Sequence, residues 1–402
     1  MRSSDRSGTR ASNRILGAVA GLTLAAAGLA TPAVGQTDEP DVEQQIRDFI
    51  FFVNINRDDA ARATAEQLLA SGMSPQEILE VVEIERLFGD LQEALGKAGR
   101  RAELEPIAGD IVVLLRDARL QRARDPGEID RNIAALTGPL RGKLYARDLL
   151  KAAGEYAMPQ LLESLLQRRD PNLRTEVQRL ISEMGRSAVV PLSTALLEVD
   201  PASQELIASI LGHLGYRTAA PFVSERASRT DNEDVRTAAE RAADELGVAA
   251  TETADLYLSI GEAYYDQRDE LTVFPGEDVQ LLWAYDPASG LLPTAIDTAV
   301  FHEAMAMRMA GRAMELGANQ TRAYGLWVAA NFSREIDEPL GYDNPAYPPS
   351  RREAMYYATF TGPTTGEDVL ARALDDTDTP LARRAINAIA QTAGPERLWS
   401  SG

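Results

Sequence analysis

Four glycines that recur every 30 to 32 residues, the first three followed five or six residues later by a proline, constrain the fold more than any other feature. The glycines are Gly154, Gly185, Gly215 and Gly247, and the prolines are Pro159, Pro191 and Pro221. A glycine after an apolar helical segment supplies the left-handed conformation that ends a helix. A proline is tolerated in the first turn of a helix but not further inside it. Each interval therefore predicts a first helix that begins near its proline, a turn, and a second helix.

The second helix of each interval has a start signal of its own. Asp170 and Asp200 each precede a proline, the pattern of an N-cap residue followed by the first helical position. Asp231 takes the same place in the third interval, where no proline follows. These acids predict second helices that begin near residues 171, 201 and 232.

One apolar frame, at positions i, i+3, i+4 and i+7, recurs in the three second helices. It comprises Val177, Leu180, Ile181 and Met184, then Ile207, Ile210, Leu211 and Leu214, and then Ala239, Ala242, Ala243 and Leu246. A helix with a single apolar stripe buries that stripe against its neighbours. We therefore expect antiparallel helix pairs that stack from about 154 to 247, with Val177, Ile207 and Ala239 in equivalent buried positions.

These intervals resemble HEAT repeats, in particular the short type also found in phycobilin lyases. The matching features are the glycine, the early proline, the acid between the helices and an arginine before the second frame, at Arg174 and Arg236. Gln204 takes that place in the second interval. The resemblance implies a right-handed α-solenoid, whose concave surface commonly binds proteins or peptides. It does not specify a function, because such arrays serve many roles.

A fourth interval, 362–394, matches less closely. Its arginine is Arg383, and its apolar frame comprises Ile386, Ile389, Ala390 and Ala393. Terminal repeats need a cover for their outer face. We expect either that Leu398 and Trp399 pack on the last helix, or that its apolar face stays open for a partner or for self-association with a second copy.

The N-terminus has the three parts of a secretory signal peptide. Arg2, Arg6, Arg10 and Arg14 precede the uncharged stretch 15–30, and Ala33 and Gly35 have the spacing that a signal peptidase reads. We expect a bacterial chain that is cleaved after residue 35 and exported to the periplasm or the outside of the cell, with no membrane span after cleavage. The alternative is an uncleaved membrane anchor, although 16 apolar residues are few for a span.

Charge and cysteine content narrow the choice of partners. The chain has a net charge of −20 and no cysteine. Removal of residues 1–35, which hold four arginines and one aspartate, makes the net charge −23. Such a surface argues against nucleic acid and anionic membranes as partners. It favours a basic partner or a cation, or it serves only solubility.

Residues 251–361 form a segment of different composition. They hold 15 of the 24 aromatic residues. LYLSIGEAYYDQ resembles the first helix of a TPR unit, through Tyr257, Ile260, Gly261 and Tyr264. Two apolar stretches around 286–290 predict a β-hairpin. A helix pair at 298–317 and 320–336, interrupted at Gly317, and a loop rich in proline and tyrosine are expected to follow.

The domain organisation predicted from these features is a signal peptide at 1–35, a helical region at 36–153, HEAT-like repeats at 154–250, the aromatic TPR-like segment at 251–361 and a C-terminal HEAT-like repeat at 362–402. The fold class is all-α, an α-solenoid of stacked antiparallel helix pairs with one β-hairpin insertion.

Catalytic and metal motifs are absent from the sequence. The only histidines are His213 and His302, and HEAMA at 302–306 lacks the second histidine of a zinc-protease helix. Without cysteine there is no cysteine nucleophile or cysteine-ligated zinc. No nucleophilic serine motif and no phosphate-binding glycine-rich loop is present. We therefore assign no catalytic residue, no metal ligand and no cofactor.

The aromatic segment is the one candidate site. Six residues could line a binding groove between the clear repeats and the last one: Trp283, Tyr285, Tyr324, Trp327, Tyr342 and Tyr347. Aromatic anchors dominate many binding surfaces; alternatively, these rings only fill gaps between helices. Asp337, Glu338 and Asp343 could receive a cationic group.

We expect a non-catalytic scaffold that binds a protein or peptide. The alternative is an enzyme or carbohydrate-binding protein that uses residues 280–350.

Overall fold

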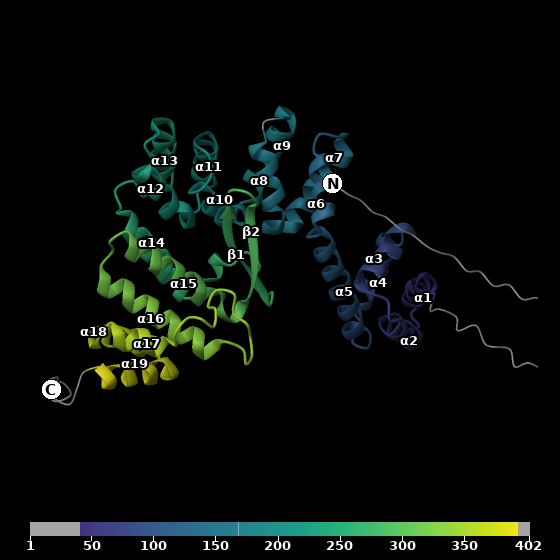
Figure 1. Cartoon of the computed structure of the whole chain (residues 1–402). Coiled ribbons are helices and arrows are strands. Elements are labelled where there is room, and N and C mark those ends of the chain that lie inside the picture. Colours follow the sequence, from purple (N-terminus) through teal and green to yellow (C-terminus); the bar gives the residue numbers. More distant parts are fainter. Residues whose placement is uncertain (1–40, 168, 393–402) are drawn as a thin grey trace, which may run out of the picture.

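The computed structural model describes residues 41–167 and 169–392. The segment expected to be a signal peptide, together with Leu398 and Trp399, lies outside these residues. Within them the chain is a succession of stacked helices and one antiparallel hairpin, as the sequence predicted (Figure 1). None of the described helices combines the length and the apolar character that crossing a membrane requires.

The N-terminal helices pack around a core of their own. They are α1 (Val42–Asn54), α2 (Asp58–Leu69), α3 (Pro75–Ile84), α4 (Phe88–Ala98) and α5 (Glu105–Ala123), and they are followed by α6 (Pro126–Ala135) and α7 (Leu140–Ala153). Ser74 caps α3 in a capping box with Glu77. Arg86, with a φ of 55°, separates α3 from α4.

The three clear repeats form stacked pairs. They consist of the 3-10 turn η1 (Gly154–Ala157), α8 (Met158–Leu166), α9 (Pro171–Met184), α10 (Arg186–Leu196), α11 (Pro201–Leu214), the turn η2 (Arg217–Ala219), α12 (Ala220–Arg229) and α13 (Glu233–Glu245). Val177, Ile207 and Ala239 are all fully buried, which confirms the alignment of the repeats. The recurring glycines all have positive φ, between 59° and 74°.

Two local expectations in the repeats were wrong. Pro191 lies inside α10, because this helix starts directly after Gly185, whereas a 3-10 turn precedes the prolines of the other two repeats. A backbone hydrogen bond is thus lost in the second turn of α10. Asn232, and not Asp231, caps α13, since its side chain accepts hydrogen bonds from two backbone N–H groups of the first turn.

The C-terminal half contains the expected hairpin and helix pair. Its elements are α14 (Thr253–Tyr265), the turn η3 (Asp269–Leu271), β1 (Val279–Asp286), β2 (Gly290–Asp297), α15 (Thr298–Glu315), α16 (Gln320–Asp337), α17 (Ala354–Phe360), α18 (Pro363–Asp375) and α19 (Thr379–Thr392). Gly290, with a φ of 77°, begins β2, and Gly317, with a φ of 86°, lies between α15 and α16.

The hairpin lies inside the curve of the helical array (Figure 1). β1 packs on α10, β2 packs on α8, and both strands contact α15. The indole of Trp283 is buried in the core of the repeats, where its Nε1 donates to Oε2 of Glu155 at 2.9 Å. The hairpin therefore joins the repeats to the aromatic segment.

The last helix buries a different face from the one that the sequence predicted. α19 buries Leu381, Ala385 and Ala388, whereas Ile386 of the predicted frame is 53% exposed. The reason is that α16, α17 and α18 all pack on one side of α19. Ile386 faces away from them, and no described residue covers it.

Candidate functional site

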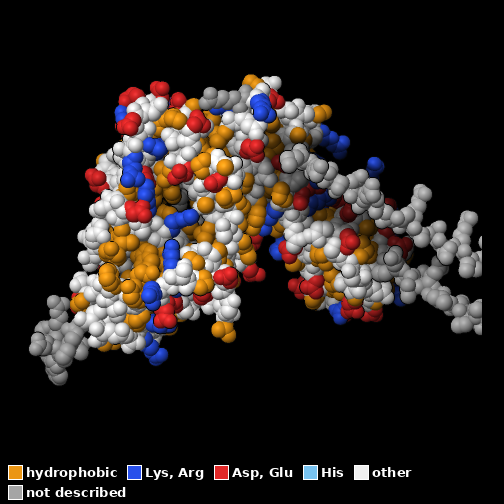
Figure 2. All heavy atoms as spheres, in the orientation of Figure 1, with side chains coloured by type: hydrophobic (Ala, Val, Ile, Leu, Met, Phe, Trp, Pro, Cys, Tyr) orange, Lys and Arg blue, Asp and Glu red, His pale blue; other side chains and the backbone are white. Residues whose placement is uncertain are grey.

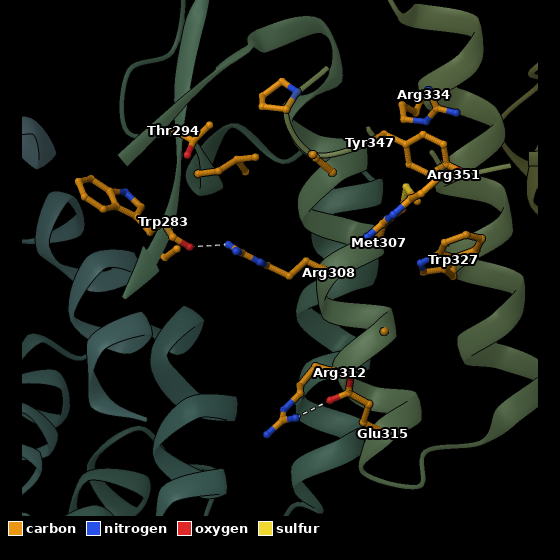
Figure 3. A pocket seen from close by; sticks show the side chains of 16 residues that line it. Trp283, Thr294, Met307, Arg308, Arg312, Glu315, Trp327, Arg334, Tyr347 and Arg351 are labelled. Carbon is orange, nitrogen blue, oxygen red and sulfur yellow. Dashed lines mark hydrogen bonds and ion pairs between the residues drawn. The ribbon is translucent and has the colours of Figure 1, made fainter. Parts of the chain in front are cut away.

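A cavity of about 540 Å³ lies between the hairpin, α15, α16 and the loop 338–353 (Figure 3). Its charged lining comprises four arginines, Arg308, Arg312, Arg334 and Arg351, and a single carboxylate, that of Glu315. In the space-filling view, basic and hydrophobic side chains lie together over the region of α14 to α16 (Figure 2). This composition contrasts with the net charge of −20 of the chain.

Arg308 lies at the centre of the cavity. Its side chain extends from α15 toward β1, where Nη1 donates to the backbone carbonyl of Trp283 at 2.8 Å (Figure 3). No carboxylate within the described part of the chain forms an ion pair with it. The residue is exposed to the cavity, yet the surrounding protein removes enough water to lower the pKa of its guanidinium. Arg308 is therefore a partly desolvated cation without a counter-charge in the part of the chain that the structure describes.

Arg351 approaches the same space from the loop. Its guanidinium lies 5.3 Å from the ring centroid of Tyr347, and none of the ion pairs found between described residues involves it. Tyr347 also stacks on Arg334, whose Cζ is 3.8 Å from the ring centroid. The hydroxyl of Tyr347 donates to the carbonyl of Arg352 and accepts from Asn331. These contacts hold the loop and its arginine against α16.

Arg312 and Arg334 differ from Arg308 because their charges are balanced. Arg312 pairs with Glu225 and Glu315. Glu225 is 2% exposed, and burial alone would raise its pKa, but hydrogen bonds from Arg312 and Tyr257 lower it overall. Arg334 donates to Glu338 at 2.7 Å and to Glu335 at 3.4 Å. The charge that remains for a ligand belongs to Arg308 and Arg351.

Two neutral donors complete the site. Nε1 of Trp327 and the hydroxyl of Thr294 border the cavity, and neither forms a hydrogen bond with a described residue. Met307 and Leu282 are apolar residues of the cavity lining. The cavity thus offers two guanidinium groups, an indole N–H and a hydroxyl beside apolar side chains. An anion with an apolar part matches this set, because charge-assisted hydrogen bonds to guanidinium are strong and directional.

The six aromatic residues expected to line one groove are divided among several environments. Tyr347 and Trp327 line the arginine cavity, to which Trp283 contributes its backbone while its indole points away (Figure 3). Tyr285 packs on the core of the repeats. The hydroxyl of Tyr342 accepts from the backbone N–H of Asp297 at 2.8 Å.

Tyr324 lies in a second, aromatic cleft of about 330 Å³ that shares Trp327 with the arginine cavity. The other rings of this cleft are those of Tyr356, Tyr357 and Phe360. Trp327 meets Tyr357 edge to face at a centroid distance of 5.0 Å. Tyr356 and Phe360 are 52% and 81% exposed, and their rings lie within 16° of parallel. Trp327 therefore separates a basic cavity from an apolar cleft.

Of the three acidic residues expected to receive a cationic group, one is already paired within the chain. Glu338 is engaged by Arg334, and no group of three His, Cys, Asp or Glu side chains that could hold a metal ion occurs among residues 41–167 and 169–392. Burial raises the pKa of Glu303 to about 7, and its Oε1 accepts a hydrogen bond from Gln267. This carboxyl lies apart from both cavities.

Sequence reasoning missed the arginines. Arg308 and Arg312 stand four residues apart in a helix that is mostly apolar, and this spacing places them on one face of it. Two such charges on a buried helix were a detectable signal.

No family model matches this chain, and no curated protein or solved structure is significantly similar to it.

Proposed function

We propose that this protein is a non-catalytic helical scaffold whose arginine cavity binds an acidic peptide segment through a carboxylate. The observation that carries the proposal is Arg308, a cation in a concave site whose one hydrogen-bond partner among the described residues is a backbone carbonyl. A desolvated charge is costly unless it is paired, so a carboxylate from a ligand would supply the missing partner. This proposal replaces the basic partner that net charge alone suggested.

The dimensions and chemistry of the site support a ligand of this kind. A volume of about 540 Å³ falls in the range of small-molecule and peptide side-chain sites. Arg308 and Arg351 both line the cavity and offer their charges to a carboxylate, and Trp327 and Met307 provide apolar contact for a neighbouring side chain (Figure 3). The HEAT-like character of the repeats and export from the cell remain parts of the same proposal.

The test is a titration of the full chain with N-acetylated, C-terminally amidated tripeptides that pair Asp or Glu with Phe, each matched by its Asn or Gln counterpart, so that the side chain carries the only carboxylate. Tryptophan emission reports binding, because Trp327 borders the cavity. We expect the acidic peptides to bind at least about tenfold more tightly than their amide counterparts, a difference of about 1.4 kcal/mol. Added salt should weaken binding.

Arg308→Met is the decisive variant, since it removes the charge and retains most of the side-chain volume. Arg241→Met is the matched control, because Arg241 is exposed on α13 away from the cavity. Arg308→Met should abolish the preference for the acidic peptide, and Arg241→Met should retain it. Equal binding of acidic and amide peptides, or an unchanged preference in Arg308→Met, contradicts the proposal.

A carbohydrate ligand is the second candidate, favoured by the exposed, nearly parallel rings of Tyr356 and Phe360. Sugar rings stack on exposed aromatic faces of this kind. A glycan screen of the full chain tests this alternative. Binding that is lost in Phe360→Ala and retained in Arg308→Met would assign the aromatic cleft to a carbohydrate.

A further inference from the structure

The stacking of helices is interrupted where the N-terminal helices meet the repeats. Residues up to Ala118 belong to one hydrophobic core, and residues from Ala123 onward belong to the next. α5 is the link between them: α3 and α4 pack on it on one side of the junction, and α6 and α7 pack on it on the other (Figure 1). Side chains of α4, α5 and α7 are therefore left facing a gap.

This gap is a groove of about 1220 Å³, more than twice the volume of the arginine cavity. Its apolar lining includes Leu91 and Leu95 of α4, Val112 of α5, and Tyr145 and Leu149 of α7. Val112 is 49% exposed and Tyr145 is 60% exposed. Apolar grooves of this extent on a protein surface mark interaction sites.

The shape of the groove fits a helix. The part of α5 that lines it runs from Val112 to Ala123, which at 1.5 Å per residue is about 16 Å, or three helical turns. Residues of α4 and α7 also line the groove, beside α5. An amphipathic helix binds such a groove through apolar residues on one face.

The charged residues of the groove indicate which charge the bound helix should carry beside its apolar face. Four arginines and two glutamates line it, and Arg122 engages both glutamates. Arg116 pairs with Asp117 next to it in sequence, Arg119 lies over the ring of Phe88, and no described residue forms an ion pair with Arg141. Arg119 and Arg141 thus form no ion pair with a described residue, and Arg116 is held only by its exposed neighbour in sequence, in a chain with a net charge of −20. An acidic partner complements this rim.

We propose that the groove between α4, α5 and α7 binds an amphipathic helix of a partner protein, with an apolar face against Val112 and Tyr145 and acidic residues toward Arg116, Arg119 and Arg141. This helix would complete the stack at the junction. The proposal is independent of the arginine cavity, which lies on other elements.

The probe is a fluorescent synthetic helix of about 14 residues, long enough to span the groove, with leucines on one face and glutamates on its flanks. Its counterpart carries lysine in place of glutamate. The matched variants are Val112→Asp and Val113→Asp. These valines are neighbours on α5 and are 49% and 45% exposed, but only Val112 lines the groove. Both variants should fold, which circular dichroism checks.

We expect the acidic helix to bind the full chain at least about tenfold more tightly than the basic one. Val112→Asp should weaken binding by a similar factor, and Val113→Asp should leave it within about twofold. Equal binding of both peptides, equal loss in both variants, or no binding at millimolar concentration overturns the proposal. Analytical ultracentrifugation would also overturn the proposal if it showed a dimer that dissociates in Val112→Asp but not in Val113→Asp, because a second copy would then occupy the groove.

Discussion

Glu155→Gln should make the protein more stable at alkaline pH while leaving its structure intact. Glu155 is 3% exposed, and its carboxylate accepts the indole N–H of Trp283. Burial raises its pKa from 4.5 to about 7, although the hydrogen bond from Trp283 and the charge of Arg124 oppose the shift. Glutamine has a similar shape, and its amide oxygen can accept the same hydrogen bond without ever ionising.

The sign of the effect follows from proton binding. In the unfolded chain Glu155 ionises near pH 4.5, but in the folded protein it ionises only near pH 7. Between these values the folded state holds the extra proton, so the free energy of unfolding of the wild type falls as pH rises. At 1.36 kcal/mol per pKa unit, the loss between about pH 5 and about pH 8 is about 2.5 kcal/mol. Glutamine removes this loss.

The assay is urea unfolding of both proteins at the two pH values, followed by tryptophan emission, which reports the core around Trp283. The free energy of unfolding of Glu155→Gln minus that of the wild type should rise by about 2.5 kcal/mol from the lower to the higher pH. Glu303, whose pKa is also raised to about 7, is present in both proteins and cancels. Parallel pH profiles, or a variant that loses stability with rising pH relative to the wild type, would refute the reasoning.

Three further changes have definite expected outcomes. Gly261→Ala should cost about 1–3 kcal/mol of stability in denaturant unfolding, because a Cβ there would lie 3.0 Å from Cδ2 of Leu326. Glu225→Gln should lower stability by about 1.5–3 kcal/mol by weakening the charged hydrogen bonds from Arg312, and a thermal melt that does not change would contradict this. Arg308→Met should keep or raise the melting temperature, since it removes a partly desolvated cation that has no ion-pair partner among the described residues; a clear loss of stability would indicate a structural role for the charge.

The repeats were predictable because their helix ends depend on residues that are close in sequence. Gly185 and Gly215 end helices with a positive φ that favours glycine, and Asp170 and Asp200 cap the helices that follow through hydrogen bonds to nearby backbone N–H groups. Pro191 was misread because the start of α10 depends on how this helix stacks on its neighbours.

The site was harder to predict because it depends on which face of the hairpin meets which helix. Trp283 and Tyr285 alternate with Leu282 along β1, so the two aromatic rings must point to the opposite face from the leucine. The pattern does not say that the aromatic face packs on α8 and α10 and that Leu282 borders the arginine cavity. Likewise, the loop position of Arg351 beside Arg308 is set by tertiary packing.

The most direct test of the central claim is a crystal structure of the full chain with the tightest-binding acidic tripeptide. The proposal predicts that the carboxylate of the peptide lies within hydrogen-bond distance of Arg308 and Arg351, with its aromatic side chain against Trp327. A peptide seated elsewhere, with Arg308 still held by the carbonyl of Trp283 alone, would contradict it.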